Sequence, residues 1–254
     1  MDYAIDYVVS DCRDYIIHKG HSKFGMEPVI IKEYKAHVLE EKITNERQHF
    51  QELQSNPHVL RFFGHCQQAK MHFCVFEDAQ FNLDQYCNHK SFSDKETVDI
   101  ANAILAGLRS LHNSSIYLLN LRLDNIWVNV DKERKCNFKF IDFLDAVKGE
   151  DAKLCNLMAD DFTAPEVSQD QYWTYVSKAD IYSLGQIIVH LKIKVGKIAE
   201  NQDKQEEAYK IEFEKMHDEL RRILEMCLKD EAADRGNLFN IGEVFKCYYA
   251  SDIR

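Results

Sequence analysis

The sequence contains few of the residues and segments that mark linkers between separate domains. Only 3 proline and 9 glycine residues occur among 254 positions, and we find no Ser/Gly-rich linker, internal repeat or low-complexity tract. Hydrophobic residues make up 45% of the chain and include 15 Phe and 12 Tyr, which is enough to bury a sizeable core. We therefore expect one large domain or two closely packed lobes.

The sequence also lacks the features of a secreted or membrane-spanning protein. Its start, MDYAIDYVVSDCRDY, is acidic and has no basic n-region. No uninterrupted apolar run approaches the roughly 18 residues that a membrane span needs. The 8 cysteines have no paired spacing, which is typical of free thiols in a reducing compartment. These absences predict a cytoplasmic protein without membrane insertion.

Basic residues are fewer than acidic residues in this sequence. The chain has 32 Lys and Arg against 42 Asp and Glu, so its formal net charge is −10. This balance argues against a general binder of nucleic acid or of anionic membranes. We expect a protein partner instead, and the charged, helix-prone segment 199–222 is a candidate contact face.

The hydrophobic pattern changes near residue 90. Before it, short β-branched segments alternate like strands, and one segment, 40–54, has the spacing of a helix. After it, an apolar stripe runs through 94–113 with Ser93 as a plausible N-cap, and 178–192 is apolar almost all round. The pattern predicts an α+β fold, with a small β-rich N-terminal lobe and a larger helical C-terminal lobe.

Several short motifs then follow one another in a specific order. They are VIIK (29–32), NPHVLRFFG (56–64), FCVFEDA (73–79), LLNLRLDN (118–125), DFL (142–144), APE (164–166), KADIYSLG (178–185) and ADRGN (233–237). In this order they resemble the motifs of the eukaryotic protein kinase superfamily over nearly the whole chain. The resemblance implies one bilobal kinase-like domain over 1–254, with an N-lobe over about 1–79, a hinge at about 77–83 and a C-lobe over about 84–254.

The resemblance also assigns roles to single residues. It makes Lys32 the phosphate-binding lysine and Glu46 its partner on the following helix, with Asn125 and Asp142 as Mg²⁺ ligands. These four form the candidate cofactor-binding set. Three further residues are expected to be architectural, namely Glu166, its partner Arg235, and the buried Asp180.

The sequence departs from the family pattern at its catalytic centre. Where HRDLKPEN has the catalytic aspartate, LLNLRLDN has Asn120, whose amide cannot accept a proton, and general-base loss costs a factor of about 10²–10⁴. The glycine-rich loop is absent, with Tyr15 at one glycine place, and DFG has become DFL through Leu144. These changes predict a pseudokinase that is not an enzyme.

Two bulky residues fall in the adenine slot that the resemblance implies. Ile30 takes the place of a small alanine, and Phe76 is at the gatekeeper position. Extra carbons in a tight pocket cost about 1–3 kcal/mol. We therefore expect no required cofactor and weak or absent binding of ATP and Mg²⁺.

Structural roles are the alternative for the same residues. Lys32 and Glu46 can be a structural ion pair, and Asp142 and Asn125 can hydrogen-bond neighbouring backbone. Phe50, Leu118 and Phe143 correspond to an apolar stack of active kinases, with a strand residue near Phe73. One set has zinc-ligand chemistry but no strong spacing, so we expect no metal site there: His65, Cys66, His72 and Cys74.

Two classes of function remain open. The first is a non-catalytic interaction module or decoy that regulates a signalling kinase or its substrate. Likenesses to the receptor-interacting and mixed-lineage-kinase-like group, and to the RNase L-like kinase domains, suggest a stress or innate-immune pathway. The second class is an atypical, weakly active protein kinase that works with Lys32, Asn125 and Asp142. A third possibility is an ATP sensor without transfer.

Overall fold

The computed structural model of the protein describes residues 2–88, 90–149, 160–169, 176–193 and 202–251. Contacts divide the chain into two units. The first combines Met1–Asn82 with Asn125–Asp145, and the second combines Leu83–Asp124 with Ala146–Arg254. The first unit is rich in strands and the second in helices, which confirms the predicted α+β class. Among the described residues, no helix is long and apolar enough to cross a membrane.

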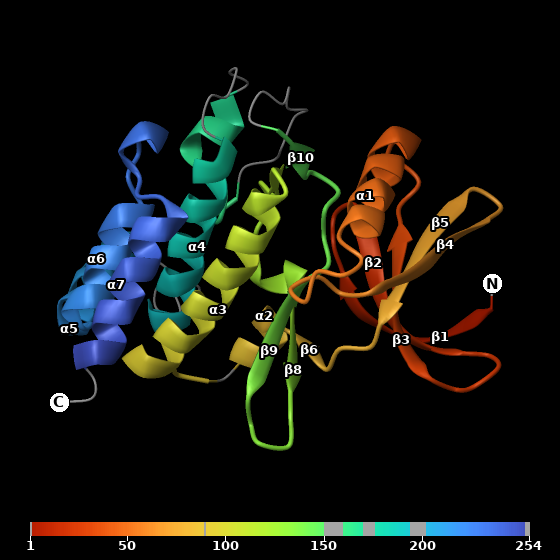
Figure 1. Ribbon diagram of the computed structural model, residues 1–254, viewed down its shortest axis with the longest axis horizontal. Helices are drawn as coiled ribbons and strands as arrows, with labels where there is room; N and C mark the ends of the chain where they lie inside the picture. The colour runs from red at the N-terminus through yellow and green to blue at the C-terminus, as the bar shows by residue number, and fades with distance from the viewer. Residues whose placement is uncertain (1, 89, 150–159, 170–175, 194–201, 252–254) are drawn as a thin grey trace. The chain divides into compact units, whose positions relative to one another are not determined.

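A five-stranded antiparallel sheet forms most of the first unit (Figure 1), with the strand order β1-β2-β3-β5-β4. The strands are β1 (Tyr3–Asp11), β2 (Tyr15–Ser22), β3 (Pro28–Tyr34), β4 (Phe62–Gln68) and β5 (Met71–Glu77). Strand β3 is central and rich in β-branched residues, and all its residues except Pro28 and Glu33 are buried. Its position in the middle of the sheet holds Lys32 away from solvent.

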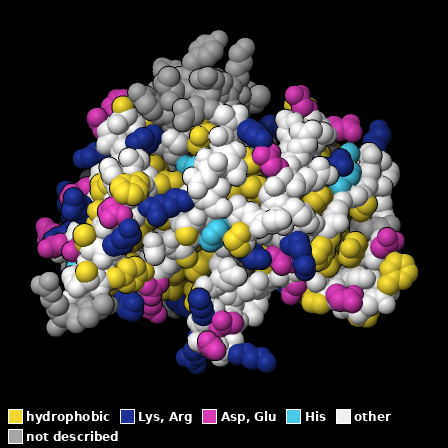
Figure 2. Space-filling view, in the orientation of Figure 1, with side chains coloured by type: hydrophobic (Ala, Val, Ile, Leu, Met, Phe, Trp, Pro, Cys, Tyr) yellow, Lys and Arg dark blue, Asp and Glu magenta, His cyan; other side chains and the backbone are white. Residues whose placement is uncertain are grey.

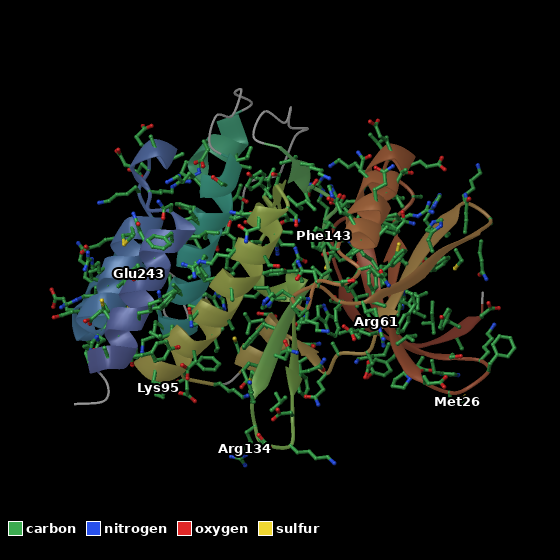
Figure 3. All side chains as sticks on the ribbon, viewed as in Figure 1. Met26, Arg61, Lys95, Arg134, Phe143 and Glu243 are labelled. Atoms are coloured by element: carbon green, nitrogen blue, oxygen red, sulfur yellow. The ribbon has the colours of Figure 1, made fainter. Side chains whose placement is uncertain are left out.

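Helix α1 (Glu40–Glu52) belongs to the same unit and buries Ile43, Glu46 and Phe50. The predicted hairpin consists of β8 (Ile126–Val130) and β9 (Cys136–Phe140), joined by β6 (Phe81–Asn82) in a second sheet of order β6-β8-β9. Figure 3 shows Arg134 at the tip of this hairpin and Phe143 inside the molecule.

The base of the hairpin is attached to the segment before β4. Val59 and Phe140 form a parallel bridge, and the N–H of Leu60 donates to the carbonyl of Phe140 over 3.0 Å. Because Phe140 lies only two residues before Asp142, this attachment directs the DFL segment towards the interior of the first unit.

Helices make up most of the second unit. They are α2 (Leu83–Cys87), α3 (Asp94–Asn113), α4 (Val176–Ile193), α5 (Gln202–Lys215), α6 (Asp218–Cys227) and α7 (Leu238–Ser251). A short pair of strands, β7 (Ile116–Tyr117) and β10 (Val147–Lys148), completes it. Helices α3, α4, α6 and α7 pack against one another (Figure 1). Helix α4 is apolar all round because it is buried on nearly every side.

Two buried charged residues anchor loops to this helical core. Asp180 of α4 accepts hydrogen bonds from the N–H groups of Leu118 (3.0 Å) and Leu119 (2.8 Å), and it also contacts His112. Arg235 donates to both carboxylate oxygens of Glu166, over 2.6 and 2.7 Å. Both contacts satisfy groups that would be costly to bury alone.

Charge of both signs is spread over the surface. Figure 2 shows Lys and Arg side chains interspersed with Asp and Glu among the described residues of the face in view. The negative net charge is therefore not gathered into one field on that face.

The start of α3 offers a test of the fold. Ser93 forms a capping box with Glu96: its hydroxyl accepts from the N–H of Glu96 over 3.2 Å, and the N–H of Ser93 donates to the Glu96 carboxylate over 2.9 Å. We expect Ser93→Ala to lower the free energy of unfolding by about 1 kcal/mol, because an orphan helix donor loses its acceptor. Urea unfolding measures this. The exposed Ser55→Ala is the control, and equal stabilities of the two variants would contradict the role of the cap.

Candidate functional site

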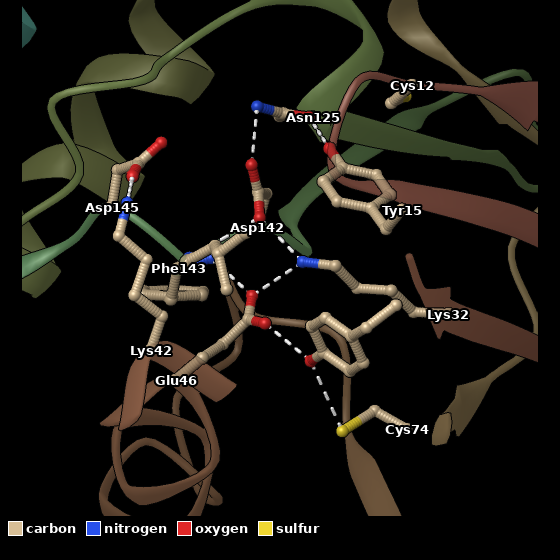
Figure 4. A network of polar contacts seen from close by, with 12 residues as sticks. Cys12, Tyr15, Lys32, Lys42, Glu46, Cys74, Asn125, Asp142, Phe143 and Asp145 are labelled. Atoms are coloured by element: carbon tan, nitrogen blue, oxygen red, sulfur yellow. Dashed lines mark hydrogen bonds and ion pairs between the residues drawn. The ribbon is translucent and has the colours of Figure 1, made fainter. Parts of the chain in front are cut away.

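Lys32 lies at the centre of a buried polar network in the first unit (Figure 4). Its Nζ lies 2.7 Å from Oε1 of Glu46 and 2.6 Å from Oδ1 of Asp142. Strand β3 carries Lys32, helix α1 carries Glu46, and Asp142 follows β9, so three elements converge on one point. The side chains of Lys32 and Glu46 are completely buried.

Asn125 and Tyr15 continue the network on one side of Asp142. The Asn125 amide donates to Oδ2 of Asp142 over 3.1 Å. The Tyr15 hydroxyl donates to Oδ1 of Asn125 over 2.6 Å, and the Tyr15 ring centroid lies 4.0 Å from Nζ of Lys32. Tyr15 is 5% exposed. The structure thus brings together all four residues of the predicted set. It adds Tyr15, which covers Asn125 and Lys32.

Glu46 accepts hydrogen bonds from two further donors, one on the DFL segment and one on β3. The N–H of Phe143 donates to Oε1 over 2.8 Å, and the Tyr34 hydroxyl donates to Oε2 over 2.5 Å. Nearby, Lys42 on α1 pairs with Asp145 over 2.7 Å. We did not predict the role of Tyr34 from the sequence, although its spacing from Lys32 indicated that the two side chains share a face. It lies two residues after Lys32 on the same strand, and so on the same face.

The burial of three charged groups together shifts their proton affinities. Burial lowers the pKa of Lys32, but the carboxylates of Asp142 and Glu46 raise it by more, and the net result is a raised pKa. Burial raises the pKa of Glu46 to about 7, against the opposing attraction of Lys32. The single Lys32 ammonium group is therefore shared by two carboxyl groups, and the pKa of the Glu46 carboxyl is raised.

An aromatic cluster packs beside this network. The Phe50 ring lies 5.2 Å from that of Phe143, 4.7 Å from Phe76 and 5.5 Å from Phe62, measured between centroids. The strand residues of the stack are thus Phe62 and Phe76. Phe73 packs instead with Val29, Ile31 and Val75.

The two residues predicted to fill a pocket lie in the sheet core. Ile30 and Phe76 face each other across β3 and β5 and are completely buried. Phe76 also packs against α1 through Phe50. Their effect on a nucleotide stays a prediction.

The DFL turn needs no special backbone. Leu144 is buried and is not one of the described residues with a positive φ. Its N–H donates to Oδ1 of Asp142 over 3.4 Å. A leucine side chain is therefore accommodated without strain at a place where the family uses glycine for conformational freedom.

The polar loop 118–125 begins in the second unit. Leu118 and Leu119 are buried and held by Asp180, whereas Asn120 is half-buried. Two residues later, Arg122 donates from Nε to Asp124 over 3.0 Å and from Nη1 to Asp160. The contact with Asp160 was not predicted, because the partners lie 38 positions apart and no local pattern links them. The loop ends in a single helical turn, η1 (Leu123–Asn125).

Comparison with known proteins agrees with this geometry. The model described as "Protein kinase domain" matches residues 17–244. A probable serine/threonine-protein kinase of Encephalitozoon cuniculi is 23% identical over 240 residues, covering 92% of this chain and 42% of the relative. The probable serine/threonine-protein kinase zyg-1 of Caenorhabditis elegans is 24% identical over 166 residues, 64% of this chain and 23% of the relative.

A third relative is a probable cell cycle serine/threonine-protein kinase, the CDC5 homolog of Encephalitozoon cuniculi. It is 28% identical over 178 residues, 68% of this chain and 37% of the relative. The chain thus spans less than half the length of these three curated relatives.

These findings correct one prediction from the sequence. We expected from Asn120, the missing glycine-rich loop and Leu144 that the chain is not an enzyme, and the kinase names of the family and its relatives contradict this. The physical reason is that phosphoryl transfer depends mainly on positioning and on stabilising charge. Losing a base costs about 10²–10⁴ in rate, which slows a reaction without abolishing it.

The raised pKa of Glu46, which shares the Lys32 ammonium with Asp142, predicts that the stability of the protein depends on pH. The native state holds the Glu46 proton up to about pH 7, whereas the unfolded chain releases it near 4.5. Since the native state binds more protons between these values, the free energy of unfolding falls as pH rises through that window. The expected contribution is about 3 kcal/mol.

Glu46→Gln removes the titrating group, and we expect the variant to lose this part of the pH dependence. Urea unfolding of both proteins on either side of the window, at about pH 4 and pH 8, measures it. Glu41→Gln, an exposed change on the same helix, is the matched control. Parallel stability profiles for the wild type and Glu46→Gln would contradict the raised pKa of Glu46.

Proposed function

This chain belongs to the protein kinase family, and on that premise we propose that it is an atypical, slow protein kinase. It transfers the γ-phosphoryl group of ATP to a hydroxyl group of a protein substrate. The observation that supports this is the assembly of Lys32, Glu46, Asp142 and Asn125 into one hydrogen-bonded set. The involvement of a stress or innate-immune pathway, a signalling kinase as partner and a cytoplasmic location stay predictions.

The donor chemistry of this set fits Mg²⁺ and phosphate. Asp142 and Asn125 lie within hydrogen-bond distance and carry the oxygen ligands that Mg²⁺ prefers. Bound there, the ion would neutralise charge on the phosphates. Lys32 supplies a fixed positive charge, and Glu46 orients it from α1. The substrate oxygen forms a bond to the γ-phosphorus while the bond from that phosphorus to the bridging oxygen breaks, and ADP leaves.

Two features of the structure support a slow rate for the proposed kinase. Tyr15 donates to Oδ1 of Asn125, which is the oxygen that Mg²⁺ would use, and its ring covers the Lys32 ammonium. Tyr15 must therefore move before nucleotide and metal can use these groups. The amide of Asn120 in place of a general base adds a second cost.

Transfer of radiolabelled γ-phosphate tests the proposal. We expect the wild-type chain with ATP and Mg²⁺ to label itself or a general protein substrate. Asp142→Asn and Lys32→Met should each lower the rate on the order of 10²-fold or more, because each removes charge stabilisation of the transition state. Lys132→Met, an exposed change in the β8–β9 turn, is the control.

Either of two results would contradict a kinase. One is the absence of label in the wild type, and the other is equal labelling by the wild type and Asp142→Asn. Binding of Mg²⁺ and ATP without any transfer would instead support a nucleotide sensor.

The cover formed by Tyr15 gives a separate prediction about binding. Tyr15→Ala removes one hydrogen bond and one cation–π contact, together worth about 1.5–3 kcal/mol. The affinity for a non-hydrolysable ATP analogue with Mg²⁺ should therefore rise on the order of 10–100-fold. Tyr15→Phe keeps the ring and should give a smaller rise.

Calorimetric titration measures these affinities. The exposed Tyr7→Ala on β1 serves as the control and should bind as the wild type does. A folded Tyr15→Ala variant that binds no more tightly than the wild type would show that Tyr15 does not compete with nucleotide.

A further inference from the structure

We propose that Arg47, His65 and His72 together bind a phosphate group on the first unit. Arg47 lies on α1, His65 on β4 and His72 on β5, and all three elements belong to that unit. None of these residues is a member of the hydrogen-bonded set around Lys32. The site therefore goes beyond the proposed kinase function and does not depend on phosphoryl transfer.

The two histidine rings contact each other across the β4–β5 hairpin. His65 lies opposite Cys74 in the strand register, and His72 lies two residues before Cys74, so both rings lie on the same face of the sheet. Nε2 of His65 lies 3.0 Å from Nδ1 of His72. A neutral imidazole has one N–H group. Whichever ring donates in this hydrogen bond, the N–H of the other ring remains for a further acceptor.

Helix α1 brings Arg47 to this face of the sheet. Phe50, three residues later on α1, packs against Phe62 of β4 with the ring centroids 5.5 Å apart. Because residues three apart are neighbours on a helix surface, Arg47 lies on the side of α1 that packs on the sheet. Figure 2 shows histidine side chains beside a Lys or Arg side chain near α1 and the β4–β5 hairpin, towards the right of the view.

The guanidinium group of Arg47 has a donor without an acceptor. Its Nε is buried, and no hydrogen bond reaches this atom from the part of the chain that the structure describes. Buried N–H groups are nearly always paired, because leaving one unpaired is costly. An acceptor supplied by a ligand would remove this cost.

The donors at this site favour an oxyanion over a metal ion. A metal ion would have to break the hydrogen bond between the rings and lie beside the positive charge of Arg47. The nearby cysteines face elsewhere: Cys66 packs with the apolar cluster on the other face of the sheet, and the Cys74 thiol accepts from the buried Tyr34 hydroxyl over 3.4 Å. Phosphate instead offers several acceptor oxygens, and arginine binds two of them in parallel.

The charges around His65 also favour a negatively charged ligand. Burial, the charge of Arg47 and the neighbouring His72 lower the pKa of His65 to about 4, and Glu40 opposes this. Glu40 is exposed and lies about two turns before Arg47 on α1. The His65 ring is therefore uncharged at neutral pH. A bound phosphate would stabilise its charged form and raise its pKa.

Titration with inorganic phosphate at constant ionic strength, followed by the NMR signals of the histidine rings, tests the site. We expect the His65 and His72 signals to shift together with one dissociation constant, and the pKa of His65 to rise. His65→Gln and His72→Gln assign the two signals. Methyl phosphate in place of the free ion shows whether the site prefers phosphate alone or a phosphate ester, and either preference supports the site.

The variant Arg47→Met separates ligand binding from a structural role. Methionine keeps an unbranched apolar stem but removes the donors, so phosphate binding should weaken on the order of 10–100-fold. The free energy of unfolding should stay the same or rise, because a buried unpaired N–H is removed. Arg61→Gln, which changes an exposed arginine of the same unit, should bind phosphate as the wild type does.

Three results would overturn the proposal. The first is a wild type whose ring signals do not respond to phosphate, or respond equally to chloride at the same ionic strength. The second is equal phosphate affinity in the wild type and Arg47→Met. The third is a loss of stability in Arg47→Met, which would show that the protein itself satisfies the buried Nε and needs no ligand there.

Discussion

A single buried ammonium group holds the polar interior of the first unit together. Lys32 pairs with Glu46 from α1 and with Asp142 from the segment after β9, in a place that water does not reach. Two carboxyl groups share this one cation, and burial, together with the nearby Asp142 carboxylate, raises the pKa of Glu46. The remaining contacts follow from this one, since Tyr15, Tyr34, Asn125 and the N–H of Phe143 each bind a member of the set.

The same set that supports the fold is the one that the proposed kinase reaction would use. A buried ion pair left without its partner is costly, so the network cannot lose a member cheaply. The chain has kept this hydrogen-bonded cluster, even though the places of the glycine-rich loop and of the catalytic aspartate hold other residues. Charge stabilisation and proton acceptance are separate parts of phosphoryl transfer, so the proposed kinase keeps the first and reacts slowly where the second is weakened.

Patterns of residues allowed much of the arrangement to be predicted. The helical stripe of 94–113 with its Ser93 cap corresponds to α3, and the apolar run 178–192 lies within α4. The partners Glu166 and Arg235 were named from motifs that lie 69 residues apart. The prediction that the chain is not an enzyme was wrong. A motif shows which residue is missing from a position, but it does not show how far the remaining groups sustain the reaction.

The sequence alone determined the elements, their order and the family, since periodicity and motif order are properties of the chain. Only the tertiary structure decided which side chains meet. Tyr15 covers Lys32 because β2 pairs with β3 in a register that sets it opposite Tyr34. Asp160 reaches the loop of Asn120 through Arg122, across 38 residues. Such contacts depend on how strands and loops pack, and no local sequence pattern shows which distant residues will meet.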